Sequence, residues 1–207
     1  MLQKKCGIDP PLAILLHSNI RWGTVEGMLS RSYVLRQAIN LVINSADELY
    51  GQITTIRRDS CAREHIPWSV FVLKPSDWEC VQDMRAVILD ANNIQQLFSD
   101  EHCATLWQAI PALEELQMAW ENKRDSSKYN QYRNAIQDGL DKINKYYNCL
   151  DDKPVYTLTL VLHPYYKLDY IKMAWGRADQ QAEDIAAGNR HAKNWHDEAM
   201  QVVEDAM

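Results

Sequence analysis

The chain has 207 residues with 22 basic and 28 acidic side chains, so its formal net charge at neutral pH is −6. Apolar residues make up 46% and charged residues 24% of the chain, proportions that are ordinary for a globular protein and exclude a disordered one. The longest apolar stretches, 12–16 and 158–162, are far shorter than the roughly 20 residues of a transmembrane helix. We therefore expect no membrane span and, with no secretion signal, an intracellular protein.

The five cysteines lie far apart and form none of the CxxC or CxxH spacings of a structural zinc site. Their odd number and irregular spacing indicate reduced, mostly buried thiols in a reducing compartment. We therefore predict no metal site and no cofactor. The cysteines are Cys6, Cys61, Cys80, Cys103 and Cys149.

Seven tryptophans and ten tyrosines dominate the aromatic residues, against two phenylalanines. Tryptophan and tyrosine carry a polar group on an apolar ring, so they suit surfaces with one wet edge. They either fill the seams between helices or form stacking surfaces for bases or partner helices. For any single tryptophan, packing between helices is the favoured interpretation.

The first half of the chain predicts two long helices with a small hairpin between them. Residues 1–19 are expected to be irregular because Pro10 and Pro11 block a helix. A helical period then runs from Thr24 to about 46–49 and ends at Gly51. The β-branched stretches 52–56 and 66–73 flank a charged turn and indicate a hairpin. The S-x-x-E sequence at 76–79 is typical of a capping box that begins the next helix, which ends near residue 98.

The second half predicts further helices. One helix spans about 104–122 and contains Pro111, which should kink it or split off its first turn. Ser126 or Ser127 caps the next helix, which contains Gly139. The segment 155–162 fits either a strand or a short buried helix. Pro164 then opens a helix through 175, and the acidic end of the chain, from 179, fits a solvated helical face.

We therefore predict a mainly α fold with three parts. These are an irregular segment at 1–19, a helical domain at 20–176 and an acidic helical segment at 177–207. A small β-hairpin near 52–73 is the expected exception.

Motifs of catalysis are absent from the sequence, which has no Gly-rich phosphate loop, no GxSxG and no HExxH. His191 and His196 are five residues apart and would lie on different faces of a helix. We interpret the adjacent His102 and Cys103 as incidental. The acidic pairs 114–115 and 151–152 are interpreted as surface or capping features rather than metal ligands. No catalytic and no metal-binding residue is predicted.

Arg21 and Trp22 stand immediately before the first long helix. A cation, a large π face and free N–H groups at a helix start could together hold a phosphate and stack a base. Residues 1–36 contain five basic and two acidic side chains, so this end is basic within an acidic chain. A structural tryptophan that anchors the helix start is an equally good interpretation.

Three segments together resemble hAT-superfamily transposases. Residues 21–31 (RWGTVEGMLSR) resemble the family's T-R-W-x-S/T-x-x-x-M-L-x-R segment. Residues 113–116 (LEEL) and 140–147 (LDKINKYY) resemble its spacer and its KYY helix. Residues 158–171, with LHPYYKL at 162–168, are similar to its A-x-x-L-D-P-R-x-K-L segment, and Trp175 matches the tryptophan that follows. His163 stands where the family often has Asp, and Tyr165 where it often has Arg.

The resemblance implies the helical insertion domain of an interrupted RNase H-like core. It implies a nuclear protein that contacts transposon-end or hairpin DNA through Trp22, with Arg21 beside it and Arg31 in the same segment. The family's catalytic Asp-Asp-Glu acids lie outside the segments matched here, so we expect no nuclease or strand-transfer activity. The alternative is a helical module that binds a partner protein or itself through exposed former core interfaces, without DNA.

Overall fold

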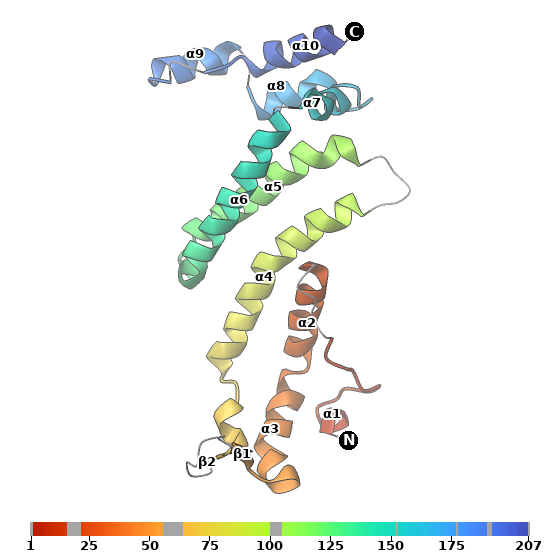
Figure 1. The fold of residues 1–207 in the computed structure, drawn as a ribbon, viewed down its shortest axis with the longest axis vertical. Helices are drawn as coiled ribbons and strands as arrows, with labels where there is room; N and C mark the ends of the chain where they lie inside the picture. The colour runs from red at the N-terminus through yellow and green to blue at the C-terminus, as the bar shows by residue number, and fades with distance from the viewer. Residues whose placement is uncertain are drawn as a thin grey trace. The chain divides into compact units, whose positions relative to one another are not determined.

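The computed structural model describes residues 2–15, 22–55, 64–99, 105–151, 153–176, 178–189 and 192–206 (Figure 1). The described chain is mostly helical, which confirms the mainly α prediction. It divides into two compact units, residues 1–92 and 93–207, which are taken separately below. None of the described helices combines the length and the apolar character needed to cross a lipid bilayer.

The division between the units falls inside a helix, at a position where the sequence indicates no boundary. The boundaries predicted at 19/20 and 176/177 stay predictions. In unit 1 the elements are α1 (Leu2–Lys5), α2 (Trp22–Val34), α3 (Arg36–Tyr50), β1 (Ile53–Thr55), β2 (Glu64–Ile66), the 3₁₀ turn η1 (Trp68–Phe71) and the first part of α4 (Pro75–Phe98).

The first long helix is broken at Leu35, so the prediction of one helix from 24 to about 49 is wrong. Leu35 has φ −84° and ψ 1°, outside helical geometry, and its side chain is fully buried. The carbonyl of Tyr33 accepts a hydrogen bond from Nη1 of Arg36 at 2.9 Å. The Arg36 side chain thus gives the Tyr33 carbonyl a hydrogen-bond donor at the break. The burial of the Leu35 side chain also stabilises the broken arrangement.

The hairpin prediction is confirmed in part. β1 pairs with β2 in antiparallel register, Ile53 opposite Ile66. The second strand begins and ends earlier than the predicted 66–73, because Pro67 has no N–H to continue the ladder. The next residue, Trp68, enters η1, where its Nε1 donates to the Gly51 carbonyl at 2.9 Å.

The capping box predicted at 76–79 is wrong, because Ser76 lies inside α4 rather than at its cap. The helix is capped two residues earlier, where the Lys74 carbonyl accepts the N–H of Asp77 and of Trp78. The Lys74 N–H in turn donates to Oδ2 of Asp77 at 2.7 Å. An acidic side chain in the first turn also suits the positive end of the helix dipole.

Asp77→Ala is therefore expected to lower the free energy of unfolding by about 1 kcal/mol, since it removes the cap and the favourable charge. Ser76→Ala should change it by less than about 0.5 kcal/mol. Urea unfolding followed by circular dichroism measures both variants. A larger loss for Ser76→Ala than for Asp77→Ala would restore the capping-box interpretation.

Unit 2 contains the remaining helices. Pro111 splits off a first turn, as predicted, because η2 precedes α5 and the proline stands in the first turn of α5, where it removes no helical bond. The elements are η2 (Leu106–Gln108), α5 (Ala109–Asp125), η3 (Ser127–Tyr132), α6 (Arg133–Asp151), α7 (Pro154–Val161), α8 (Lys167–Ala174), α9 (Ala178–Ala186) and α10 (Trp195–Ala206).

The serine cap predicted for the next helix is wrong, since α6 begins only at Arg133. Ser126 makes no side-chain cap to the 3₁₀ helix that follows it. Tyr129 has the non-helical angles φ −100° and ψ 17°, so an α-helix cannot run from the serines through this position.

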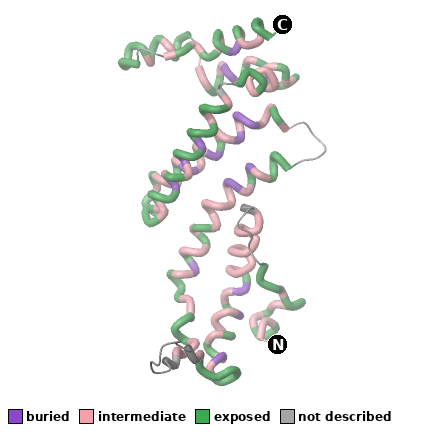
Figure 2. The backbone as a smooth tube through the Cα atoms, in the orientation of Figure 1, coloured by how far each residue is buried: buried purple, intermediate pink, exposed green. Residues whose placement is uncertain are grey.

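The core of unit 2 lies along the line where α5 packs against α6, and Figure 2 shows buried residues on both helices. Gly139 of α6 touches Trp120 of α5 so closely that a Cβ atom there would stand 2.3 Å from the indole Cζ3. The large side chains buried along this line are Ile110, Leu116, Trp120, Ile136, Leu140 and Ile143.

The segment 155–162, left between strand and helix, is the helix α7. Pro154 stands in its first turn, the helical position where proline is best tolerated. Leu160 of α7, Ile171 of α8 and Ala199 of α10 form a second buried cluster. The acidic end is helical as predicted, and Ala199 anchors it to α7 and α8.

Candidate functional site

Two of the three residues predicted to contact DNA, Trp22 and Arg31, belong to α2. Arg21 lies outside the described residues. Trp22 is the first residue of α2, and only its backbone is described. The first N–H groups of a helix have no partner within the helix itself, which is why helix starts are common sites of anion binding.

Arg31, the third predicted DNA contact, lies apart from Trp22. The nine residue steps from Trp22 to Arg31 along α2 turn the helix by about 180° and advance it by about 13.5 Å. Nη1 of Arg31 donates to the Ala13 carbonyl at 3.3 Å. The structure thus gives Arg31 a role in holding the segment that precedes α2, and its DNA contact stays a prediction.

A carboxylate in unit 2 unites three segments far apart in the sequence. Tyr147 of α6 donates its hydroxyl to Oε1 of Glu114 at 2.8 Å. Tyr170 of α8 donates to Oε2, and Nε1 of Trp175, at the end of α8, donates to Oε1. We call Glu114 and its three donors the Glu114 cluster.

This cluster was not predicted from the sequence, where the acidic pair 114–115 is interpreted as a surface feature. Glu115 is exposed, but Glu114 is half-buried. The three donors lie 33, 56 and 61 residues away from Glu114, so no local pattern indicates them. One signal was present: the LEEL, KYY and tryptophan segments of the transposase resemblance each contain a member of the cluster.

The cluster changes the acidity of one of its members. Burial, and then the hydrogen bond to the Glu114 carboxylate, raise the pKa of Tyr170 above its ordinary value of 10.0. The folded chain therefore keeps this phenol proton at pH values where the unfolded chain loses it. By linkage, the contribution of Tyr170 to stability is complete below pH 10 and falls as the pH rises above it.

The stability of the wild type is accordingly expected to fall between pH 9 and pH 11 by up to about 1 kcal/mol on account of Tyr170. One titrating group can change the free energy of unfolding by about 1.4 kcal/mol per pH unit. The Tyr170 side chain is partly exposed, and solvent screening reduces this value. Tyr170→Phe should show a smaller fall, and Tyr165→Phe, in an exposed ring, the same fall as the wild type. Urea unfolding at both pH values measures this, and equal falls in all three proteins would contradict the account.

His163 organises the turn between α7 and α8. Its Nδ1 accepts the backbone N–H groups of Tyr165 and Tyr166 at 3.3 and 3.4 Å. Its ring lies 4.3 Å from the ring of Trp107, centroid to centroid. Because the imidazole accepts these N–H groups, residues 164–166 form a turn and α8 begins only at Lys167. The prediction that Pro164 opens the helix is therefore wrong.

An aspartate can accept the same two N–H groups, as in an Asx turn. His163 therefore supplies the acceptor that the resembled family often has as Asp. We expect His163→Asp to be more stable than His163→Ala by about 1 kcal/mol, although both lose the contact with Trp107. Thermal unfolding of the two variants compares them, and an Asp variant no more stable than the Ala variant would show that Nδ1 does not hold the turn.

Most of the other residues considered for chemistry cannot be compared in space. His102, Cys103, Asp152 and His191 are outside the described residues, and His196 lies 3.2 Å from its neighbour Asp197. Across the described ranges, no three His, Cys, Asp or Glu side chains lie close enough together to hold a metal ion.

The expectation of mostly buried thiols is wrong for the cysteines that the structure describes. Cys6 and Cys80 are half-buried and Cys149 is exposed. Cys61 and Cys103 lie outside the described residues.

Comparison of the chain with protein-family models, with curated proteins and with solved structures finds no match.

Proposed function

We propose that the chain is the helical insertion-domain part of a hAT-like transposase, and that it binds DNA without cutting it. The observation that carries this proposal is the start of α2 at Trp22, directly after Arg21. The first N–H groups of a helix have no partner within the helix itself, and the sequence supplies an arginine and a tryptophan at this point, whose guanidinium and indole are groups that bind a phosphate and stack on a base. The resemblance to this family implies a nuclear protein, and a nuclear location is part of the proposal.

The Glu114 cluster supports the family part of the proposal. Three segments that are distant in the sequence meet in this cluster. The segment that resembles the spacer supplies the carboxylate of Glu114, and the segments that resemble the KYY helix and the final tryptophan supply Tyr147 and Trp175, which donate to it. Each of these side chains depends on the others for its hydrogen bonds. We therefore expect the four residues to occur together in related chains. The family's catalytic acids lie outside these segments, and cutting is not part of the proposal.

Fluorescence anisotropy with a labelled hairpin-ended duplex tests the DNA contact. We expect Trp22→Ala to weaken binding about tenfold or more, since base–aromatic stacking contributes about 1–3 kcal/mol. Arg21→Ala should weaken binding and also reduce its salt dependence, because one phosphate contact is lost.

Matched variants in unit 2 serve as controls. Trp195→Ala removes a tryptophan and Arg133→Ala an exposed arginine, and neither should change DNA affinity. Circular dichroism checks that each variant is folded. If the folded Trp22→Ala chain binds the hairpin as tightly as the wild type does, the proposal is wrong.

A second candidate function is a protein-interaction module, and exposed side chains in unit 2 favour it. Leu162 and Tyr165, in the turn after α7, are 74% and 82% exposed. Apolar side chains presented on an ordered turn suit a partner protein or a second copy of the chain. If this function holds, Leu162→Asp abolishes self-association in sedimentation velocity, and the wild type shows no preference for hairpin DNA.

A further inference from the structure

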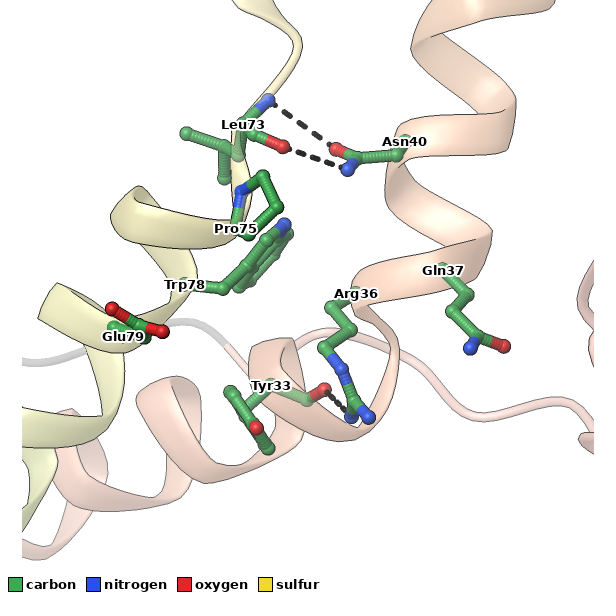
Figure 3. Close-up of a pocket in the computed structure, with 8 residues that line it drawn as sticks. All are labelled: Tyr33, Arg36, Gln37, Asn40, Leu73, Pro75, Trp78 and Glu79. Carbon is green, nitrogen blue, oxygen red and sulfur yellow. Dashed lines mark hydrogen bonds between the residues drawn. The ribbon is translucent and has the colours of Figure 1, made fainter.

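A pocket of about 330 Å³ lies in unit 1, between the beginning of α3 and the beginning of α4 (Figure 3). None of the three predicted DNA contacts lines it, so an inference from this pocket stands independently of the proposed function. A volume of this size is at the lower end of those that bind small molecules.

The wall of the pocket is held rigidly. The Asn40 side chain of α3 donates to the Leu73 carbonyl at 2.8 Å and accepts the Leu73 N–H at 3.3 Å. These two bonds join α3 to the segment that leads into α4, as the dashed lines in Figure 3 show. Trp78 reaches from α4 towards α3 and is only 7% exposed. The pocket is therefore formed before any ligand arrives, which reduces the entropy cost of binding.

Arg36 supplies a cation whose position is defined. Its guanidinium lies 4.4 Å above the Tyr33 ring, and Nη1 donates to the Tyr33 carbonyl. In the part of the chain that the structure describes, it forms no ion pair with a carboxylate. Most of its five N–H donors are thus available, and their fork matches a carboxylate or a phosphate.

The remaining lining residues narrow the class of ligand. Trp78, Leu73 and Pro75 offer an apolar wall, which suits a planar apolar body. Within the described ranges, the buried Nε1 of Trp78 has no acceptor, so the chain itself leaves a donor unsatisfied at this wall. Glu79 also lines the pocket, so the lining carries one negative charge in addition to the positive charge of Arg36. A dianionic phosphate would be repelled by Glu79 more than a monoanionic carboxylate.

We propose that this pocket binds a small planar carboxylate, with the carboxylate on Arg36 and the apolar body against Trp78. The carboxylate forms paired hydrogen bonds with the guanidinium, and the ring system replaces water at the apolar wall. Glu79 weakens the affinity and selects against a second negative charge.

Isothermal titration of the full chain with 2-naphthoate tests the proposal. From the number of heavy atoms in this probe we expect a Kd of about 0.1–1 mM. Arg36→Gln should weaken binding about tenfold, and Glu79→Gln should tighten it about threefold. Lys145→Gln, which removes an exposed cation in unit 2, should leave the Kd unchanged. Circular dichroism checks that each variant is folded. Because the Glu79 side chain is exposed, Glu79→Gln is expected to fold, and it tests the proposal even if Arg36→Gln does not fold.

Two further probes define the class. The neutral 2-naphthalenemethanol should bind at least tenfold more weakly than 2-naphthoate, because it lacks the anion. The dianionic 2-naphthyl phosphate should bind more weakly to the wild type and gain more than 2-naphthoate from Glu79→Gln. The proposal is overturned if 2-naphthoate does not bind, if the alcohol binds equally well, if the phosphate binds more tightly, or if Glu79→Gln does not tighten binding.

Discussion

Glu114→Ala is expected to lower the free energy of unfolding by about 3 kcal/mol, because three donors lose their acceptor at once. Tyr147, Tyr170 and Trp175 come from two helices and a helix end that meet α5 through this carboxylate. A hydrogen bond to a charged group contributes about 1.5–3 kcal/mol, and partial solvation of half-buried partners reduces the sum. Urea unfolding followed by circular dichroism gives the value.

Two variants show whether this loss belongs to the cluster. Glu114→Gln keeps one acceptor oxygen and should lower the free energy of unfolding by about 1 kcal/mol. Glu115→Ala changes the exposed neighbour and should cost less than about 0.5 kcal/mol. A loss at Glu114→Ala no greater than at Glu115→Ala would mean that the three contacts contribute nothing to stability.

Gly139→Ala is expected to destabilise the chain by about 2 kcal/mol, although alanine is the better helix former. The substitution gains about 1 kcal/mol of helix propensity. Against this, the new Cβ would stand 2.3 Å from Cζ3 of Trp120, a ring atom of a buried side chain that cannot move aside without opening the core. Overpacking a core costs about 1–3 kcal/mol, and so close a contact lies at the upper end of this range.

Gly27→Ala in α2 is the matched control. There a Cβ would meet only Cδ1 of Leu15 at 3.2 Å, the end of an exposed side chain that can turn away. This variant should be stabilised by up to about 1 kcal/mol. In addition, Trp120→Leu should remove most of the penalty of Gly139→Ala in a double-mutant cycle. A stabilised Gly139→Ala chain would contradict the packing of α5 on α6.

The core of unit 2 was predictable from the sequence because it is built from residues three and four positions apart. Ile136, Leu140 and Ile143 recur with the helical period and are all buried in α6. The same reasoning is less reliable in α4, where the apolar side chains of Met84 and Leu97 are 37% and 42% exposed. Periodicity indicates that a face exists, and only the neighbouring elements decide how much of that face is covered.

Features that depend on distant partners were not predictable. Leu35 sits in an unbroken helical pattern, and the break there depends on the burial of its side chain and on Arg36 reaching the Tyr33 carbonyl. The Glu114 cluster likewise depends on donors more than 30 residues away. The Arg21–Trp22 pair could be singled out from the sequence because its position near the start of a helix is a local property, and its contact with DNA stays a prediction.

The affinity ratio of the wild-type chain for a hairpin-ended duplex and a blunt duplex tests the central claim most directly. We expect the hairpin to bind at least tenfold more tightly, because its unpaired bases can stack on Trp22 while Arg21 and the start of α2 hold the phosphate. Both affinities should fall as salt is raised from 50 to 200 mM. Equal affinity for the two duplexes, or no binding by a folded chain at 50 mM salt, would contradict the account.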